Sequence, residues 1–93
     1  MAIGASVESA AIQGGIGVCK TSIHELQTAS NSLKNSYQQA GASGWKDQKY
    51  AALGGIVDEC CSALTKPVSD LQDCIGSLQK LLEAVREYES TNL

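Results

Sequence analysis

Cysteines are the most reactive side chains in this sequence, and it holds four: Cys19, Cys60, Cys61 and Cys74. Cysteine thiolates bind metals, form disulfides and act as nucleophiles. Cys60 and Cys61 are adjacent rather than spaced as CxxC, and His24 is the single histidine, so a zinc site is not expected. We expect the four cysteines to act as small, buried hydrophobic side chains. A disulfide across a dimer, or redox sensitivity, is the alternative.

No other set of residues forms a catalytic or cofactor-binding pattern. His24 has only Glu25 beside it, and no Ser/His/Asp or Cys/His arrangement is apparent. Most carboxylates fall on polar helix positions. The glycine-rich stretch Gly14-Gly15-Ile16-Gly17 is neither GxGxxG nor a phosphate-binding loop. The sequence therefore predicts no enzyme, no cofactor and no metal.

Charge and hydropathy limit the classes of partner. The net charge is −3, and the basic residues are scattered, which argues against nucleic acid or an anionic membrane as the main partner. No apolar run approaches the ~20 residues of a membrane span. The start, Met1-Ala2-Ile3-Gly4, lacks a basic segment followed by an apolar one, so we expect no Sec-type signal.

Helical periodicity on both sides of one small-residue cluster predicts a single all-α domain over residues 1–93. The cluster Ala40–Gly44 reads as a loop. We expect a first helix over about 6–40 with Ser6 as N-cap, a turn over about 41–44, and a second helix over about 45–89. Pro67 lies inside the second helix, where we expect a kink, with a break into two helices as the alternative.

Each predicted helix has an apolar seam with alternating steps of three and four residues. The first seam consists of Ile12, Ile16, Cys19, Ile23, Leu26, Ser30, Leu33, Tyr37 and Ala40. The second consists of Tyr50, Leu53, Val57, Cys60, Leu64, Pro67, Leu71, Cys74, Leu78, Leu81, Val85 and Tyr88. A turn near residue 43 would place Cys19 opposite position 67, too far from the other cysteines for an intrachain disulfide.

Two long helices and a short loop predict an antiparallel two-helix hairpin. A further apolar line on the second helix, at Cys61, Val68, Ile75 and Leu82, makes its apolar face wider than one partner helix needs. We therefore expect dimerisation into a four-helix bundle, with itself or with a related hairpin. The expected interface residues are Leu64, Val68, Leu71, Ile75, Leu78 and Leu82.

The only tryptophan, Trp45, follows Gly44 at the predicted turn and precedes Asp47. A chain of this length, with two helices and a tryptophan at the central turn, resembles the WXG family of bacterial type VII secretion substrates. The resemblance covers essentially the whole chain, and 44–53 resembles the start of that family's second helix. The family has Trp-any-Gly at the tip, whereas this chain has Asp47, as in a divergent member.

The resemblance implies a secreted helical hairpin without a signal peptide, cytoplasmic before export. Its expected partners are itself, a related hairpin or the N-terminal helical domain of a larger effector, together with the secretion ATPase. The family's export signal is Tyr-x-x-x-Asp/Glu; here Tyr88 is followed by Asn92, which lacks the charge. Export with a partner that supplies the signal is therefore open, and a non-exported cytoplasmic adaptor or chaperone and a structural coiled-coil component are the alternatives.

Overall fold

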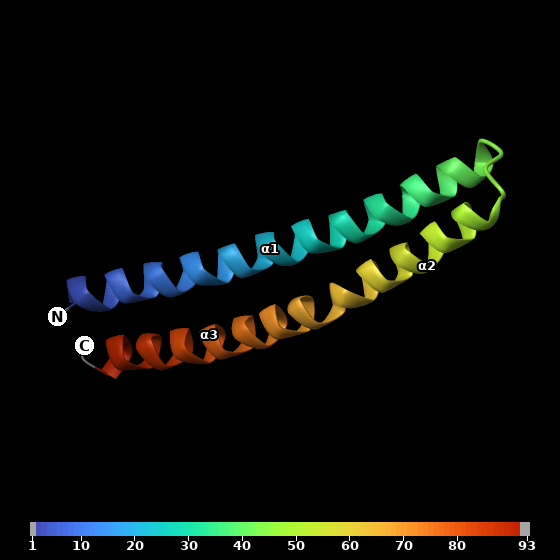
Figure 1. Ribbon diagram of the computed structural model, residues 1–93. Coiled ribbons are helices and arrows are strands. Elements are labelled where there is room, and N and C mark those ends of the chain that lie inside the picture. The colour runs from blue at the N-terminus through green and yellow to red at the C-terminus, as the bar shows by residue number, and fades with distance from the viewer. Residues whose placement is uncertain (1, 92–93) are drawn as a thin grey trace. The chain divides into compact units, whose positions relative to one another are not determined.

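The computed structural model describes the backbone of residues 2–91 and the side chains of residues 7–88. The prediction of an all-helical chain is confirmed, since every regular element within 2–91 is a helix: α1 (Ala2–Ala42), α2 (Gln48–Ala63) and α3 (Thr65–Thr91) (Figure 1). α1 begins before Ser6, which therefore lies inside the helix and is not its N-cap. None of these helices combines the length and apolar character that a membrane span requires.

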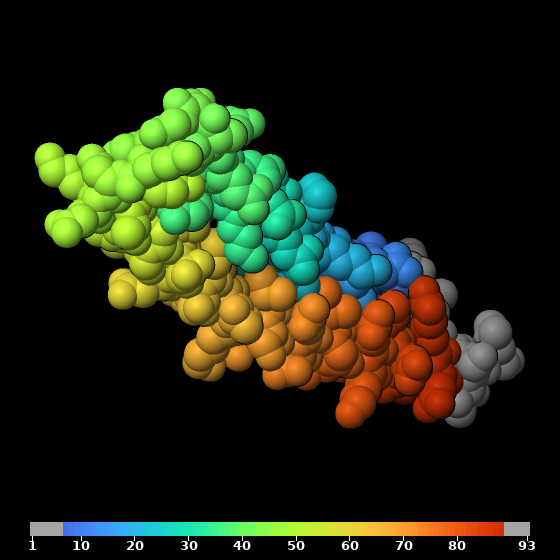
Figure 2. Space-filling view, turned by 90° about the vertical axis from the view of Figure 1, so that its right-hand side faces the viewer, coloured from blue at the N-terminus to red at the C-terminus, as the bar shows by residue number. Residues whose placement is uncertain are grey.

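The helices are grouped in two compact units. Unit 1 joins Met1–Ile23 to Asp70–Leu93, and unit 2 is His24–Ser69. In unit 1, the first part of α1 runs antiparallel to most of α3, and Figure 2 shows these segments, blue and orange to red, in contact. Unit 2 is a helical hairpin that contains the end of α1, the turn, α2 and the first residues of α3.

The apolar seam predicted for the first helix is the face that α1 buries. Along the seam, from Ile12 to Ala40, every residue is buried or half-buried except Leu33, which is 38% exposed. Ile16 is the best buried of them. Burial of such a stripe against a second helix is what stabilises a helix of this length in water.

The seam of α2 and α3 differs from the predicted seam at four positions. At each of them the residue that faces inward is the one after the predicted residue. The half-buried or buried line is the one spaced by seven residues: Cys61, Val68, Ile75 and Leu82. The residues one position earlier are exposed: Cys60, Pro67, Cys74 and Leu81. Apolar area favours this choice at two steps, where Val68 replaces Pro67 and Ile75 replaces Cys74 on the side toward α1. The residue types are the same at the other two steps, which follow from the helix periodicity. The remaining seam residues, such as Val57 and Leu78, face inward as predicted.

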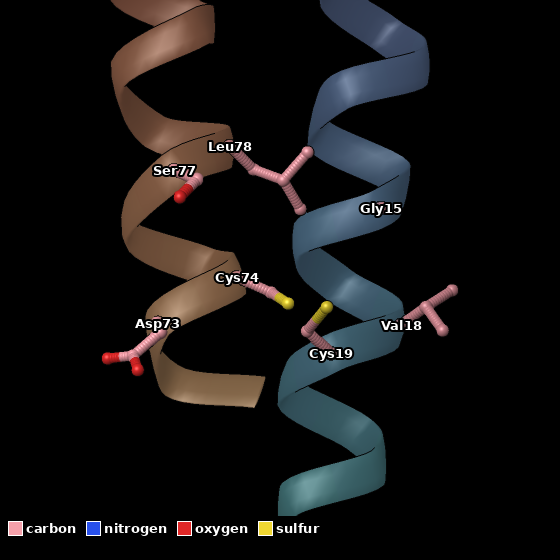
Figure 3. Close-up of a pocket in the computed structure, with 7 residues that line it drawn as sticks. All are labelled: Gly15, Val18, Cys19, Asp73, Cys74, Ser77 and Leu78. Atoms are coloured by element: carbon pink, nitrogen blue, oxygen red, sulfur yellow. The ribbon is translucent and has the colours of Figure 1, made fainter. Parts of the chain in front are cut away.

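The register between the two arms also differs from the predicted one. A Cβ on Gly15 would lie 3.6 Å from Leu78 Cδ1, so these two residues are opposite each other. One turn further along, Cys19 lies opposite Cys74, not opposite position 67 (Figure 3). The turn between α1 and α2 occupies 43–47, later in the chain than expected, and each position of α1 consequently faces a later residue of the second arm.

Pro67 explains why the second arm is two helices and not one. Proline has no N–H to donate to the carbonyl four residues earlier, and its ring pushes that carbonyl away. The carbonyl affected is that of Ala63, which is the last residue of α2. Leu64 keeps right-handed helical angles (φ −82°, ψ −12°), and its N–H bonds the Cys61 carbonyl at 3.2 Å. The interruption is therefore one residue long, intermediate between the expected kink and the alternative of a full break.

Pro67→Ala should join α2 and α3 into one helix. The new amide N–H can donate to the Ala63 carbonyl, and we expect the free energy of unfolding to rise by about 1–2 kcal/mol, after allowance for the freer unfolded chain. Urea unfolding followed by circular dichroism measures it, with the exposed Ser62→Ala as control. Equal or lower stability of Pro67→Ala would show that the interruption has another cause.

Candidate functional site

The turn between α1 and α2 begins with a helix cap built on Gly44. Gly44 has φ +104°, and its N–H bonds the Gly41 carbonyl at 3.0 Å. The N–H of Trp45 bonds the Ala40 carbonyl at 3.2 Å. This pair of bonds is the Schellman motif, which needs a left-handed residue just past the helix. α1 therefore runs through Gly41 to Ala42, and the predicted helix end at Ala40 and turn at about 41–44 are too early.

Asp47 begins the next helix and also fixes the tryptophan. Its backbone is extended (φ −82°, ψ −176°), and its Oδ1 accepts the Tyr50 N–H at 3.0 Å, which makes it the N-cap of α2. The same oxygen accepts the Trp45 Nε1–H at 2.7 Å. α2 consequently starts at Gln48, later than the predicted start at about 45.

Three aromatic side chains form a cluster at this end of unit 2. Tyr37 of α1 and Tyr50 of α2 stack with ring centroids 4.3 Å apart and planes 8° apart. Trp45 lies tilted against Tyr50 at 5.5 Å. The Tyr50 hydroxyl donates to the Tyr37 backbone carbonyl at 2.9 Å, which ties α2 to α1. We call Tyr37, Trp45, Asp47 and Tyr50 the tip cluster.

Two glycines make room for the tyrosines. A Cβ on Gly54 would lie 2.6 Å from Tyr37 Oη and 2.8 Å from its Cζ. A Cβ on Gly41 would collide with Tyr50 Oη. Each ring therefore lies directly on the backbone of the opposite helix. A larger residue at either position would force the ring, and the stacking with it, out of place.

The side chains of the tip cluster combine one exposed ring with polar atoms that are already hydrogen-bonded. Desolvation and the neighbouring Tyr37 raise the pKa of the Tyr50 phenol, so this hydroxyl stays a hydrogen-bond donor at neutral pH. Trp45 is 40% exposed, and its one polar atom is already bonded to Asp47. Its free ring face offers apolar area to a partner, as tryptophans at interfaces do. Among residues 7–88, no three His, Cys, Asp or Glu side chains form a metal-binding group.

The sequence identified part of this cluster. The expected tip residues Gly44, Trp45 and Asp47 do lie together, with Gly44 as the cap and Asp47 holding Trp45. Tyr37 and Tyr50 were expected only as seam residues. A turn near residue 43 already sets Tyr37 nearly opposite Tyr50, so their contact could have been predicted from that register. Gly41 and Gly54, each beneath one of the two rings, were the further signal.

A second exposed surface lies on unit 1. Val18 and Cys74 line one open depression between α1 and α3 (Figure 3). Leu81 and Tyr88 follow Cys74 at seven-residue intervals, and Val7 precedes Val18 by three turns, so all belong to the same side. Val7, Val18, Leu81 and Tyr88 are 52–66% exposed. We call these residues and Cys74 the apolar face of unit 1. Exposed α3 residues on the other side of the Leu71–Leu78 seam are polar: Gln72, Gln79 and Arg86.

The other residues that the sequence singled out were predicted to form an interface or an export signal. They lie in the helix seam and near the end of the chain, respectively. Those expected to form an interface with a partner are half-buried or buried within the chain itself: Leu64, Val68, Leu71, Ile75, Leu78 and Leu82. Tyr88, of the expected export signal, is 61% exposed. Asn92, the other residue of that signal, lies outside the described residues.

Gly54→Ala should destabilise the protein, whereas the adjacent Gly55→Ala should stabilise it. The new methyl at position 54 meets the Tyr37 ring, which we expect to cost about 1–3 kcal/mol. A methyl at position 55 has nothing within 4 Å, and replacing a helical glycine there should gain about 0.5–1 kcal/mol. Thermal unfolding of both variants checks the difference. Equal effects would mean that the tyrosine does not rest on Gly54.

Comparison with protein-family models, with curated proteins and with solved structures finds no match to this chain. The resemblance to the WXG family therefore stays a prediction that depends on Trp45, Asp47 and the helical pattern. Any assignment of function has to be argued from the two surfaces just described, the tip cluster and the apolar face of unit 1.

Proposed function

We propose that this chain is a non-enzymatic helical protein that acts by packing against a second helical hairpin, within a bacterial type VII secretion system. It would be exported as a substrate or co-secreted as the partner of a larger effector. The observation that carries the proposal is the small amount of apolar side chain that the chain buries alone. Only Ile16, Val57 and Leu82 are buried among residues 7–88, and none of them is less than 6% exposed.

Surface area supports the need for a partner. A compact monomer of 9.7 kDa exposes about 5,100 Å², whereas this chain exposes 6676 Å². The excess of about 1,500 Å² exceeds the roughly 800 Å² that each side contributes to a standard protein–protein interface. A second hairpin of similar length would cover an area of this order and complete a four-helix bundle.

The apolar face of unit 1 is the surface on which we place the partner. Besides Cys74 its residues are aliphatic or aromatic, with Asp73 and Ser77 also lining the depression there, while the opposite side of α3 carries amides and an arginine. Burying the exposed part of several such side chains contributes about 25 cal/mol per Å² of apolar area. Because the two sides of unit 1 differ in this way, packing of a second hairpin on one side leaves a polar outer surface.

The secretion role draws support from the tip cluster. An exposed tryptophan at a helix–helix turn, fixed by the N-cap aspartate of the next helix, is the feature that resembles the WXG tip. Asp47 takes the place of the family's glycine, and the left-handed residue of the turn is Gly44 instead. The turn thus keeps its glycine, one position before the tryptophan.

Assembly should depend on Leu81 and not on Gln79. Both are exposed and lie on α3, but only Leu81 belongs to the apolar face of unit 1. Leu81→Lys should weaken self-association or binding to a partner hairpin by about tenfold or more, because the charge would have to be desolvated. Gln79→Lys adds the same charge on the polar side and should change little.

Sedimentation velocity across a concentration series measures both variants, for the chain alone and with the helical domain of a candidate effector from the same host. If Leu81→Lys assembles like the unsubstituted chain, the partner does not lie on this face.

Export is tested by measuring the protein in culture supernatant of its native host, with and without the membrane ATPase of the secretion system. We expect release that requires the ATPase and falls in Trp45→Ala, with Lys46→Ala as the matched control at the next position of the tip. Asn92→Asp, which restores the family's signal, should increase release. Retention in the cytoplasm with the ATPase active would refute the secretion role.

A non-exported adaptor with the same fold is the second candidate function. The observation that favours it is the set of free thiols: all four cysteines are unpaired, and those of Cys60 and Cys74 are exposed. Free thiols persist best in a reducing compartment. An adaptor would bind its partner through the same apolar face but stay in the cell, so the export experiment separates the two functions.

A further inference from the structure

Cys19 and Cys74 stand opposite each other on the two helices of unit 1. Figure 3 shows Cys19 and Cys74 on the facing sides of α1 and α3, with the Cys74 sulfur directed toward α1 and the Cys19 sulfur turned along α1. Both residues line the same open depression. Cys19 is half-buried and Cys74 is exposed, so an oxidant in solution can reach the pair.

The two helices are in side-chain contact at this level. One turn away, Gly15 carries no side chain, and a Cβ built there would be in ordinary contact with Leu78 at 3.6 Å. Leu78 projects over Gly15 (Figure 3). Cys19 and Cys74 face each other across the two helices, so rotation of the two side chains together with a small movement of the helices can bring the sulfurs to bonding distance.

The other two cysteines have no such partner. Cys61 donates its thiol to the Ser30 carbonyl at 3.7 Å, on the inner side of unit 2. Cys60 is exposed on the same helix, α2. Adjacent cysteines in a regular helix point in directions about 100° apart, which does not suit a bond between them.

We propose that Cys19 and Cys74 form an intrachain disulfide when the protein meets an oxidising environment. This inference goes beyond the proposed function and does not depend on it. In exchange with a small-molecule disulfide such as glutathione disulfide, one thiolate attacks the reagent and releases one glutathione thiol. The second cysteine then attacks the mixed disulfide and releases the other. The protein loses two hydrogens, and the reagent is reduced to two thiols.

The bond would join α1 to α3 and enclose residues 20–73 in one covalent loop. It would restrict separation of the two helical segments of unit 1, which share few buried side chains. In a reducing compartment the same pair would remain open. The pair thus makes the stability of unit 1 responsive to the redox state of its surroundings.

The test uses the full chain, reduced, freed of reductant and incubated with glutathione disulfide. Free thiols are then blocked, and the chain is cleaved on the amino side of aspartates. This cleavage separates Cys74, in the fragment that starts at Asp73, from Cys60 and Cys61, in the fragment that starts at Asp58. Mass spectrometry should find the fragment that contains Cys19 linked to the fragment that contains Cys74, and a reductant should release them.

Mixing isotopically heavy and light chains before oxidation shows whether the bond is made within one chain. Linked fragments should be all heavy or all light; mixed pairs would mean a bond between chains and would overturn the proposal. So would blocked, unlinked Cys19 and Cys74 after oxidation.

Matched variants supply a second measurement. The Cys60→Ser/Cys61→Ser double variant should keep the cross-link, and its melting temperature should rise by about 5 °C or more on oxidation. Cys19→Ser should lose both the cross-link and the rise. A rise of the same size in Cys19→Ser, or no rise in the double variant, would contradict the proposal.

Discussion

Each helix segment in this protein has essentially one neighbour, and that constraint governs the rest of the structure. A helix that packs against a single partner can cover only one stripe of its side chains. The stripe on α1 runs from Ile12 to Ala40 and remains mostly half-buried. Apolar side chains beside the stripe, such as Val18 and Leu81, stay exposed. This exposed apolar area is the reason for proposing that the chain acts by packing against another helical protein.

The two units differ in the kinds of contact that hold their helices together. In unit 2, tyrosine rings lie on bare glycine backbone, and the Tyr50 hydroxyl bonds a main-chain carbonyl across the helix pair. In unit 1, aliphatic side chains and a pair of thiols lie between the helices, and Gly15 faces Leu78. Only in unit 2 does the contact require glycine, because a Cβ on Gly15 would still fit against Leu78. The tip is fixed by directional bonds, whereas unit 1 depends on apolar contact, which is weak when so much of it is open to water.

Periodicity was sufficient to predict the helices and the inner face of α1, because these depend on local pattern alone. It was not sufficient for the register. The turn lies later in the chain than expected, and this shift hid the facing of Cys19 and Cys74, whereas Tyr37 and Tyr50, close to the turn, were already nearly opposite in the predicted register. The choice between the lines that contain Cys60 and Cys61 was likewise not local: both are apolar, and they differ in residue type only where Val68 and Ile75 stand beside Pro67 and Cys74. Trp45 was found because it is the only tryptophan and lies at the predicted turn, and Asp47 because aspartate is favoured where a helix begins, while their hydrogen bond depends on geometry.

The position of Trp45 also determines the fluorescence of the protein. It is the only tryptophan of the chain, and three tyrosines accompany it. Tyr50 lies 5.5 Å from it, and Tyr37 stacks on Tyr50. Excitation absorbed by those phenols can pass to the indole over such a short distance, and the indole N–H is held by a carboxylate. The protein therefore carries its own fluorescent reporter at the tip, whose emission responds to the local polarity around one known residue.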